Sequence, residues 1–242
     1  PVLVTPRVIR GDDDEYRGSF YLSSDTIVGS DGLVVKDYIK EISDLKGKKI
    51  AVEVATDEHF LLHKALERGN LEEKDVTIIP TTAQEGIEKF IKGQVDACFT
   101  YDPYLTRGAK KGAGEILIST AEMKGIMIDT LVAKSKALEE REEDYINIIK
   151  AWYRAQEFVK NNPQEAYELM AAKENMSYQE FKNFYEEFTF FSLADNKETF
   201  TCQNFRNKLS EMNQFLEEKE LISEITPIEE LYTTDIVDEI SE

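Results

Sequence analysis

The segment from residue 43 to residue 106 restricts the possible folds most, because strand patterns and helix patterns alternate along it. The patterns, in chain order, are a buried strand at 49–53, a helix at 56–66, a strand at 76–79, a helix at 83–92 and a strand near 95–100. Apolar residues alternate or run together in the strand segments and recur every three to four residues in the helical ones. The order predicts a compact α/β unit with a parallel sheet.

Two polar and aromatic segments stand where the apolar strands of this unit end. They are Val54-Ala55-Thr56-Asp57 and Thr100-Tyr101-Asp102-Pro103-Tyr104. Units of this kind bind ligands at the carboxyl ends of their strands. The sequence therefore predicts a ligand site that both segments line.

The rest of the chain predicts strands before this unit and helices after it. Residues 1–36 have an extended pattern, with Phe20-Tyr21-Leu22 as one strand candidate and a turn at residues 29–32. Residues 125–134 predict a further strand. The later helical segments are residues 145–160, a helix beginning at Pro163, a helix capped by Ser177, and residues 201–218. The chain is thus expected to be an α/β protein with a helical C-terminal region.

Six segments carry a family resemblance when they are taken in order. Within the central unit they are "DLKGKKIAVE", "HFLLHKALERG" and "GQVDACFTYDPYL", and later "GIMIDTLVAKSKALEE", "IIKAWYRAQEFVKNNPQEAYELMA" and "LADNKETF". Together, over about residues 25–230, they resemble the type II periplasmic substrate-binding proteins. The most similar group serves nitrate, sulfonate, taurine and thiamine-precursor ABC transporters.

The resemblance implies two lobes, each with a mixed or parallel sheet flanked by helices, and two crossings of the chain between them. The matching crossings lie near residues 33–35 and 128–131. We therefore expect residues 37–125 to form the second lobe, and residues 1–36 with 126–242 to form the first. Because members of the family carry further strands and helices before the first crossing, we expect the first lobe to be incomplete here.

Composition and charge restrict the classes of partner. The 242 residues are 41% hydrophobic and 32% charged, which is typical of a globular chain with a sizeable core. The formal net charge is −19, which argues against nucleic acid and against an anionic membrane surface because both would repel the chain. No apolar run approaches the roughly 20 residues of a membrane span, and no signal peptide is recognised. Together with the resemblance, this implies a periplasmic or extracytoplasmic protein whose export signal is not in this chain. Any membrane association would then come through a partner or a lipid anchor.

The turn Thr56-Asp57-Glu58-His59 opens the first helix of the central unit. A helix N-terminus offers free amide donors and a partial positive charge, which suit an anion, and in similar proteins this turn can hold an oxyanion of the ligand. A purely local role is also open, in which Thr56 is the N-cap and the two acids complement the helix dipole. In either case the carboxylates compete with a bound anion and favour a neutral or cationic ligand over nitrate or sulfonate. Thr56 and His59 are predicted ligand-binding residues.

The segment Tyr101-Asp102-Pro103-Tyr104 matches a family motif of an aromatic residue, an acid, a proline and a second aromatic residue that faces the cleft. Aromatic rings can stack on a flat ligand or enclose a cation, and Asp102 can accept hydrogen bonds from ligand N–H groups. The local alternative is a strand-to-helix turn in which Asp102 caps the helix and Pro103 takes its first position. The two roles are compatible, so Tyr101, Asp102 and Tyr104 are predicted ligand-binding residues.

Two acids sit at the presumed crossings between lobes. Asp31 follows Ser30 in a Gly-Ser-Asp-Gly turn, and an ordinary turn is the alternative to a role in the cleft. Asp129 interrupts an apolar strand pattern, where a carboxylate must be paired or face a cavity. In the resembling family, acids near these places line the cleft or brace the hinge. Ser30, Asp31 and Asp129 complete the predicted ligand-binding set.

Metal, cofactor and catalytic signatures are missing from the sequence. His59 and His63 are one helical turn apart, but Phe60 follows His59, so the H-E-x-x-H pattern is absent and a packing or surface role is favoured. Cys98 is expected to be a buried thiol, and Cys98 with Cys202 make no disulfide framework. No nucleophile elbow and no phosphate-binding glycine motif is present. We expect no metal, no cofactor and no enzymatic activity.

The leading functional hypothesis is the soluble substrate-binding component of an ABC importer, with the transporter permease and a small molecule as partners. It would close two lobes around the ligand. Acids and aromatic residues favour a nitrogen-containing heterocycle or an amine, such as a thiamine-precursor pyrimidine. The alternatives are the ligand-sensing domain of a signalling receptor and, less favoured, a pyrimidine-synthesis enzyme on the same fold, whose cysteine-rich motif has no match here.

Overall fold

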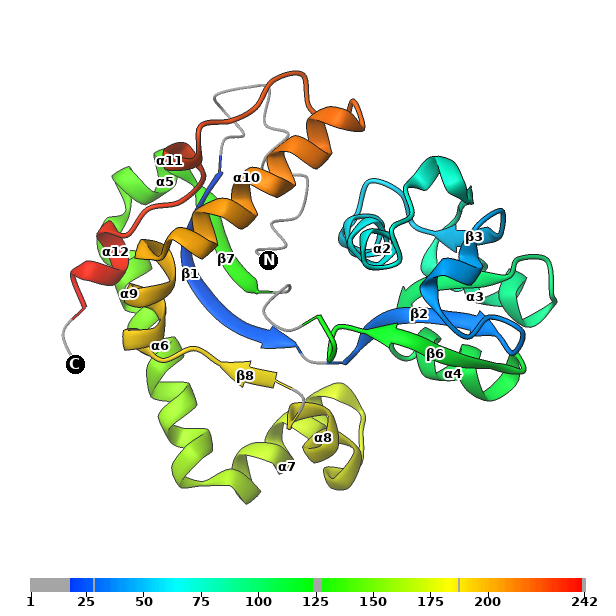
Figure 1. Cartoon of the computed structure of the whole chain (residues 1–242). Helices are drawn as coiled ribbons and strands as arrows, with labels where there is room; N and C mark the ends of the chain where they lie inside the picture. Colours follow the sequence, from blue (N-terminus) through cyan, green and yellow to red (C-terminus); the bar gives the residue numbers. More distant parts are fainter. Residues whose placement is uncertain (1–17, 28, 124–127, 187, 241–242) are drawn as a thin grey trace. The chain divides into compact units, whose positions relative to one another are not determined.

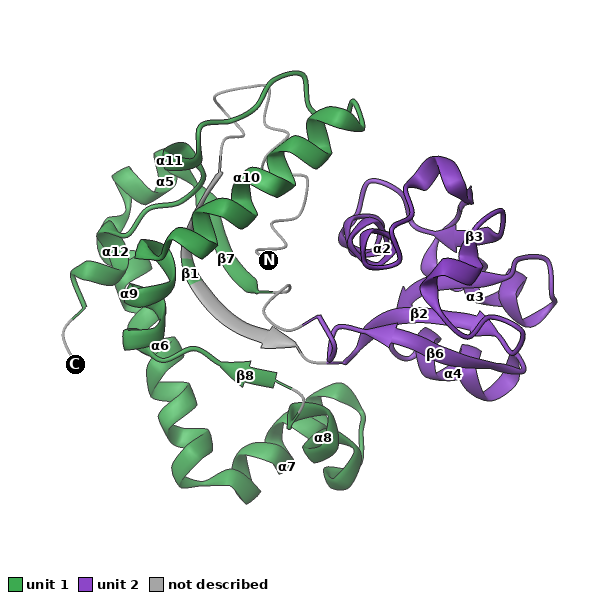
Figure 2. Cartoon of the chain, viewed as in Figure 1, with its two compact units in different colours: residues 1–27, 127–242 green, residues 28–126 purple. Residues whose placement is uncertain are grey.

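The computed structural model describes residues 18–27, 29–123, 128–186 and 188–240. The chain divides into two compact units (Figures 1 and 2). Unit 1 comprises residues 1–27 and 127–242, and unit 2 comprises residues 28–126. Each unit is an α/β body with its own sheet and its own core.

Unit 2 is built on a five-stranded mixed sheet. Its strands are β2 (Asp31–Lys36), β3 (Lys49–Val52), β4 (Thr77–Pro80), β5 (Ala97–Tyr101) and β6 (Gly114–Ser119), in the spatial order β4-β3-β5-β2-β6. β3 pairs in parallel with β4 and β5, whereas β2 pairs antiparallel with β5 and β6. The carboxyl ends of β3 and β5 and the beginning of β2 therefore meet at one edge of the sheet.

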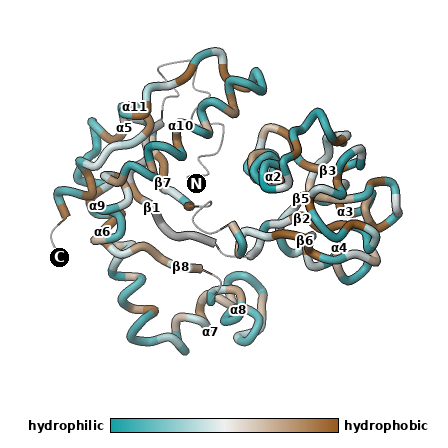
Figure 3. Tube along the Cα trace, viewed as in Figure 1, coloured by the Kyte–Doolittle hydropathy of each residue, from teal (hydrophilic) through white to brown (hydrophobic). Residues whose placement is uncertain are grey.

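Helices cover both faces of this sheet. They are α2 (Asp57–Arg68), α3 (Ala83–Ile91) and α4 (Tyr104–Lys111), with short 3₁₀ turns η1 (Ile42–Leu45) and η2 (Glu73–Asp75). α3 and α4 pack on Val34, Ala51 and Cys98, which lie on one face. Neighbouring residues of a strand point to opposite faces, so α2, which packs on the same three strands, covers the other face. Buried on both sides, the central strands are hydrophobic along their length (Figure 3).

One glycine of the sheet is required by a close approach of two backbones. A Cβ atom at Gly32 would lie 2.7 Å from the carbonyl oxygen of Ile118 on the neighbouring strand β6. No side chain fits in that space, so the turn from Ser30 into β2 lies directly against β6. This close packing holds Asp31 at the edge of the sheet.

Unit 1 is built on a three-stranded antiparallel sheet. Its strands are β1 (Gly18–Ile27), β7 (Asp129–Lys134) and β8 (Phe188–Phe190), in the spatial order β7-β1-β8. Leu22 of the central strand is fully buried. The long β1 joins segments that are far apart in the sequence, since its two neighbours come from the middle and the C-terminal part of the chain.

Helices make up most of the rest of unit 1. They are α5 (Ser135–Glu140), α6 (Glu142–Asn161), α7 (Pro163–Glu174), α8 (Tyr178–Tyr185), α9 (Leu193–Thr201), α10 (Gln203–Glu218), α11 (Ile228–Leu231) and α12 (Asp235–Asp238). Phe200 stacks on Tyr232, and Phe205 meets both rings edge to face, between α9, α10 and the end of α11, with ring centroids 5.3–5.5 Å apart. These aromatic rings anchor the C-terminal helices to one another.

Several predictions from the sequence are confirmed in detail. The two helices and three strands of the central unit are present, as are the helix of residues 145–160, the helix that begins at Pro163 and the strand at 129–134. Ser177 caps α8, because its Oγ accepts a hydrogen bond from the backbone N–H of Glu180. Cys98 is buried, and neither cysteine forms a disulfide.

Other features differ from the sequence prediction. The three predicted strands β3, β4 and β5 pair in parallel as expected, but β2 and β6 join them in the antiparallel sense, so the whole sheet is mixed. The sequence assigned residues 31–36 to the first lobe, but the structure places them in unit 2, because β2 hydrogen-bonds between β5 and β6. β6 and the three-residue β8 were not predicted, since both depend on pairing with distant strands. Within the predicted N-terminal segment, residues 1–17 lie outside the described part of the chain.

Candidate functional site

Six of the eight predicted ligand-binding residues lie at the edge of the unit 2 sheet where β3 and β5 end, and a seventh, His59, follows in the first turn of α2. Asp31 at the start of β2 is directly opposite Tyr101 at the end of β5 in the antiparallel ladder. α2 and α4 begin just beyond β3 and β5, at residues 57 and 104. The topology thus brings together residues that are up to 74 positions apart in the sequence, from Ser30 to Tyr104, as the rule for α/β sheets predicts. We call this region, comprising Ser30, Asp31, Thr56, Asp57, Glu58, Tyr101, Asp102 and Tyr104, the acidic edge.

Asp31 is a buried carboxylate at the base of the acidic edge. Its side chain is 5% exposed, and Ser30 Oγ donates a hydrogen bond of 2.7 Å to Asp31 Oδ2. Burial raises the pKa of Asp31 from 3.8 to about 6, against the opposing effect of the Ser30 hydrogen bond. The negative charges of Asp57 and Asp102 raise this pKa further. A positively charged ligand group placed here would replace the interactions with water that the Asp31 carboxylate loses on burial.

Backbone hydrogen bonds hold the Ser30-Asp31 turn in place. The N–H of Asp102 donates to the carbonyl of Ser30, and the N–H of Thr120 donates to the carbonyl of Asp31, both at 2.8 Å. The hydroxyl of Thr120 accepts from the N–H of Gly29 at 2.9 Å. These contacts tie β2, β5 and the end of β6 together, so Asp31 and Asp102 keep a defined separation.

The start of α2 adds a second buried acid. Glu58 is 6% exposed, and burial together with the neighbouring Asp57 raises its pKa well above 4.5. Thr56 is the N-cap residue by position, but its hydroxyl donates to the carbonyl of Glu53 at 2.6 Å. Thr56 thus takes the N-cap position that the local alternative gave it, but its side chain makes no capping hydrogen bond, because the hydroxyl turns back to the end of β3.

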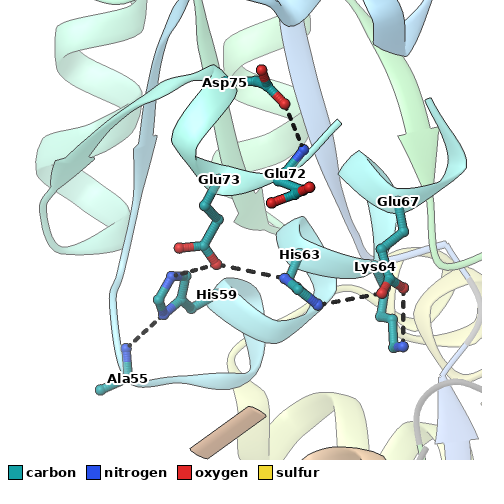
Figure 4. A network of polar contacts seen from close by, with 8 residues as sticks. All are labelled: Ala55, His59, His63, Lys64, Glu67, Glu72, Glu73 and Asp75. Carbon is teal, nitrogen blue, oxygen red and sulfur yellow. Dashed lines mark hydrogen bonds and ion pairs between the residues drawn. The ribbon is translucent and has the colours of Figure 1, made fainter. Parts of the chain in front are cut away.

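His59 belongs to a polar network between α2 and η2 (Figure 4). Its Nδ1 accepts from the N–H of Ala55 at 3.4 Å, and its Nε2 lies 3.3 Å from Glu73 Oε1. The His59 ring therefore lies between the turn at Ala55 and the side chain of Glu73. His63, one turn later, contacts Glu73 at 3.7 Å and Glu67 at 3.4 Å.

This network gives His59 a positioning role. Ala55 has a φ of 65°, in the left-handed region that a residue with a Cβ rarely adopts. The hydrogen bond from its N–H to His59 helps to hold this turn between β3 and α2. Both ring nitrogens of His59 are thus used inside unit 2, and a direct contact with a ligand stays a prediction.

Tyr101 and Tyr104 form the aromatic part of the acidic edge. Their ring centroids are 5.6 Å apart and the rings meet edge to face at 81°. Tyr101 is 37% exposed, and Tyr104 is partly buried. Burial raises the pKa of Tyr101, and the negative charge of Glu58 raises it further. The Tyr101 ring therefore lies near the acids of α2. An exposed tyrosine face next to carboxylates suits a flat or cationic ligand group.

Asp102 has the capping role that the sequence left open. Its Oδ1 accepts a hydrogen bond of 2.9 Å from the backbone N–H of Thr106 in the first turn of α4. The peptide bond between Asp102 and Pro103 is cis, and Pro103 is the N-cap residue rather than the first residue of the helix. One carboxylate oxygen of Asp102 thus orients α4, and the side chain stays exposed at the edge.

The charged side chains that influence one another at the acidic edge are negative. The charged groups that shift the pKa values of Asp31, Glu58 and Tyr101 are Glu53, Asp57, Glu58 and Asp102, together with Tyr104. Among the described residues, the groups that dominate these three shifts include no lysine or arginine. Carboxylates that are buried beside one another repel an anion and favour a cation or an N–H donor.

Sequence reasoning overlooked two acids of this region. Glu58 was treated only as part of a helix start, although its burial makes it one of the most perturbed groups of the edge. Glu53 ends the strand pattern of β3, and its Oε2 accepts from the N–H of Ala83 at 3.2 Å, which fixes the start of α3. Glu53 could have been recognised as a site residue from the sequence, because it is an acid at the end of a buried strand. The burial of Glu58 had no local signal.

Asp129, the eighth predicted residue, lies in unit 1. It is the first residue of β7, opposite Asp25 of β1, and it is partly buried. β7 begins at Asp129, directly after the buried Ile128, and residues 126 and 127 of the predicted strand lie outside the described part of the chain. Its role toward a ligand stays a prediction.

The described residues contain no group of three or more His, Cys, Asp or Glu side chains placed to hold a metal ion. Within the same residues, every helix is too short or too polar to cross a membrane.

Comparisons with known proteins agree on one family. A family model described as "NMT1/THI5 like" matches residues 32–166, which is more than half of the chain. Over 131 residues, or 54% of this chain, the sequence is 28% identical to a Bacillus subtilis (strain 168) protein described as an aliphatic sulfonates-binding protein, of which the match covers 40%. The chain spans less than half the length of the curated relatives it matches.

Solved structures with low sequence identity share the fold. The periplasmic aliphatic sulphonate binding protein SsuA from Escherichia coli aligns with a TM-score of 0.72 at 16% identity, covering 93% of this chain and 72% of that one. The desulfurization enzyme DSZB aligns with a TM-score of 0.64 at 15% identity, covering 92% and 78%. These likenesses confirm the predicted α/β fold of a periplasmic binding protein, with mixed sheets flanked by helices. The family model, which covers more than half of the chain, shows that this chain belongs to the NMT1/THI5-like family.

Proposed function

We propose that this chain is the substrate-binding component of an ABC importer, and that its ligand is a nitrogen-containing heterocycle or an amine. A thiamine-precursor pyrimidine is one example of this class. The family membership supports the general role, because the named relatives are binding proteins. The observation that carries the ligand class is the acidic edge, where two tyrosines adjoin several carboxylates and no cation takes part.

The acidic edge offers two kinds of contact to such a ligand. Asp31 and Glu58 are desolvated acids with raised pKa values, so each gains from a ligand N–H or a positive charge nearby. Tyr101 presents an exposed ring on which a flat heterocycle can stack. A second lobe that closes over this edge would remove water and strengthen both contacts.

An aliphatic sulfonate is the second candidate, because the names of several relatives point to it. Its negative charge would meet the carboxylate of Asp57 in the first turn of α2, which is the helix start that would otherwise attract an anion. We therefore place it second. The same site would serve a receptor sensor, in which case the partner would be a signalling domain instead of a permease.

We also propose that the protein is not an enzyme, although DSZB shares its fold. Burial raises the pKa of the Cys98 thiol to about 12, so this cysteine is not a thiolate nucleophile near neutral pH. The importer role further implies a periplasmic or extracytoplasmic location and a permease as partner.

Isothermal titration calorimetry tests the ligand class. The probes are 4-amino-5-hydroxymethyl-2-methylpyrimidine and ethanesulfonate, and we expect binding of the aminopyrimidine only. Tyr101→Ala should weaken it by roughly 1 kcal/mol or more, about fivefold, through lost stacking. Tyr38→Ala is the matched control, because Tyr38 is 56% exposed and lies just beyond the opposite end of β2. Binding of ethanesulfonate alone would reject the ligand class, and unchanged affinity in both Tyr101→Ala and Tyr104→Ala would reject the site.

The pH dependence of binding gives an independent prediction. Benzamidine, a flat cation over the whole range, should bind about tenfold more tightly at about pH 7 than at about pH 5, because Asp31 with a pKa of about 6 loses its proton between them. Deprotonation of Glu58 should extend the trend to higher pH. In Asp31→Asn the gain between these two pH values should shrink. A flat profile in the unchanged protein would contradict the role of Asp31.

A further inference from the structure

Unit 1 contains a groove that the proposed function does not use. It has a volume of about 920 Å³. Its wall residues come from α6, α7, α8, β8, the start of α9 and the segment after α12: Lys150, Tyr153, Arg154, Gln156, Glu157, Val159, Lys160, Pro163, Tyr167, Tyr185, Phe190, Ser192, Leu193 and Ile240. We call it the α6–β8 groove. Small-molecule sites commonly have volumes of about 300–1,000 Å³ and are lined by aromatic residues with a few polar groups.

One wall of the groove is a row of aromatic rings. Tyr185 stacks on Phe190 with centroids 4.9 Å apart and an angle of 26°, and Tyr167 lies 5.1 Å from Tyr185. Trp152 packs behind Phe190 at 6.1 Å. The rings support one another, so they form a preorganised apolar surface on which a planar molecule can lie.

The rim of the groove is cationic, in contrast to the rest of the chain. Lys150, Arg154 and Lys160 are exposed residues of α6 that line it, and Glu157 is the only acid among the lining residues named above. Within the described part of the chain, none of the three basic residues forms an ion pair. Lys136, Arg141, Lys182 and Arg206 of the same unit each do. In a protein with a net charge of −19, a rim with a net charge of about +2 concentrates anions locally.

Tyr153 adds a hydrogen-bond donor inside the groove. Its hydroxyl oxygen accepts from Nδ2 of Asn196, a fully buried residue, at 3.1 Å. Burial raises the pKa of Tyr153 to about 12, so the hydroxyl keeps its proton and can donate it. A fixed O–H donor near two cations suits a carboxylate or another small oxyanion.

We propose that the α6–β8 groove is a second ligand site, and that it binds small planar aromatic anions. The ring of such a ligand lies against Tyr167, Tyr185 and Phe190, and its anionic group faces Lys150, Arg154 and the hydroxyl of Tyr153. This site lies wholly within unit 1. Its preference is opposite in charge to that of the acidic edge in unit 2, so the two sites select different molecules.

Fluorescence titration with 9-anthroate tests the proposal, with the uncharged 9-anthracenemethanol as its matched analogue. We expect one molecule of 9-anthroate per chain. Lys150→Gln and Arg154→Gln should each weaken it about tenfold, the loss of one charge-assisted hydrogen bond. Neither should change the weaker binding of 9-anthracenemethanol. Tyr185→Ala should weaken both probes, and circular dichroism checks that this variant remains folded.

Two control variants separate the groove from other binding modes. Lys136→Gln removes an exposed lysine of α5, paired with Glu140, that does not line the groove, and it should leave 9-anthroate binding unchanged. Tyr101→Ala alters the acidic edge and should also leave it unchanged. The proposed site is overturned if Lys150→Gln and Arg154→Gln bind 9-anthroate as tightly as Lys136→Gln does. It is also overturned if Tyr101→Ala abolishes binding of 9-anthroate.

Discussion

Glu58→Gln is expected to stabilise unit 2 by several kcal/mol at about pH 8 and to have little effect at about pH 4, where Glu58 is protonated in both states. Burial and the adjacent Asp57 raise the pKa of Glu58 from 4.5 to about 8 in the folded protein. The folded state therefore binds more protons than the unfolded state between these values, so the free energy of unfolding falls as pH rises through this window. Each pKa unit corresponds to about 1.4 kcal/mol. Glutamine keeps the shape of the side chain without the buried charge.

The measurement is urea unfolding at several pH values, followed by hydrogen exchange of β5 peptides, because the single tryptophan, Trp152, lies in unit 1. In Glu58→Gln, the free energy of unfolding should fall with rising pH only where Asp31 titrates. That range runs from the ordinary Asp31 pKa of 3.8 to its raised pKa of about 6. Glu85→Gln is the matched control, since it removes an exposed acid from the first turn of α3. A Glu58→Gln protein that still loses stability between about pH 6 and about pH 8 would contradict the assignment.

Phe90→Ala should lower the free energy of unfolding of unit 2 by about 3–5 kcal/mol, the usual cost of removing a buried aromatic ring. Phe90 is 0% exposed and packs with Val34, Ile87 and Cys98 in the core between α3 and the sheet. The ammonium of Lys36 also lies 4.3 Å from its ring centroid. The truncation therefore leaves a cavity and removes a cation–π contact.

Urea unfolding with the same hydrogen-exchange readout measures this change. Ile116→Ala is the control within unit 2, because Ile116 of β6 is 44% exposed, and its loss should cost less than about 1 kcal/mol. Equal effects of the two substitutions would show that Phe90 does not hold α3 on the sheet. Phe90→Ala should also lower the protection of the Gly112 turn against hydrogen exchange, because Gly112 lies against the Phe90 ring.

Local sequence patterns predicted the elements well because their determinants are local. The helices α2, α3, α6 and α8 follow apolar residues at helical spacing, and Ser177 with Glu180 signals the start of α8 through a capping box. The strands β3 and β5 are short apolar runs next to turn residues. Elements that depend on partners were missed: β8 has only three residues and forms because β1 lies beside it.

Part of the candidate site was also predictable from the sequence. The carboxyl ends of β3 and β5 follow from the order of elements, so Thr56, Tyr101, Asp102 and Tyr104 could be placed at one edge. The direction of the Thr56 hydroxyl and the contacts of His59 could not, because each depends on an atom of another segment, Glu53 in one case and Glu73 in the other. Hydrogen-bond partners across loops have no periodic signal.

The amino-acid sequence by itself determined the α/β class, the family, the positions of most helices and the acidic and aromatic character of the strand ends. Periodicity, capping residues and ordered motifs encode these features within a few neighbouring positions. Only the tertiary structure decided which acids are desolvated, that β2 belongs to unit 2, and that α6, α8 and β8 enclose a cationic aromatic groove. Burial and electrostatic coupling depend on distances between segments far apart in the chain, and those distances are set by packing.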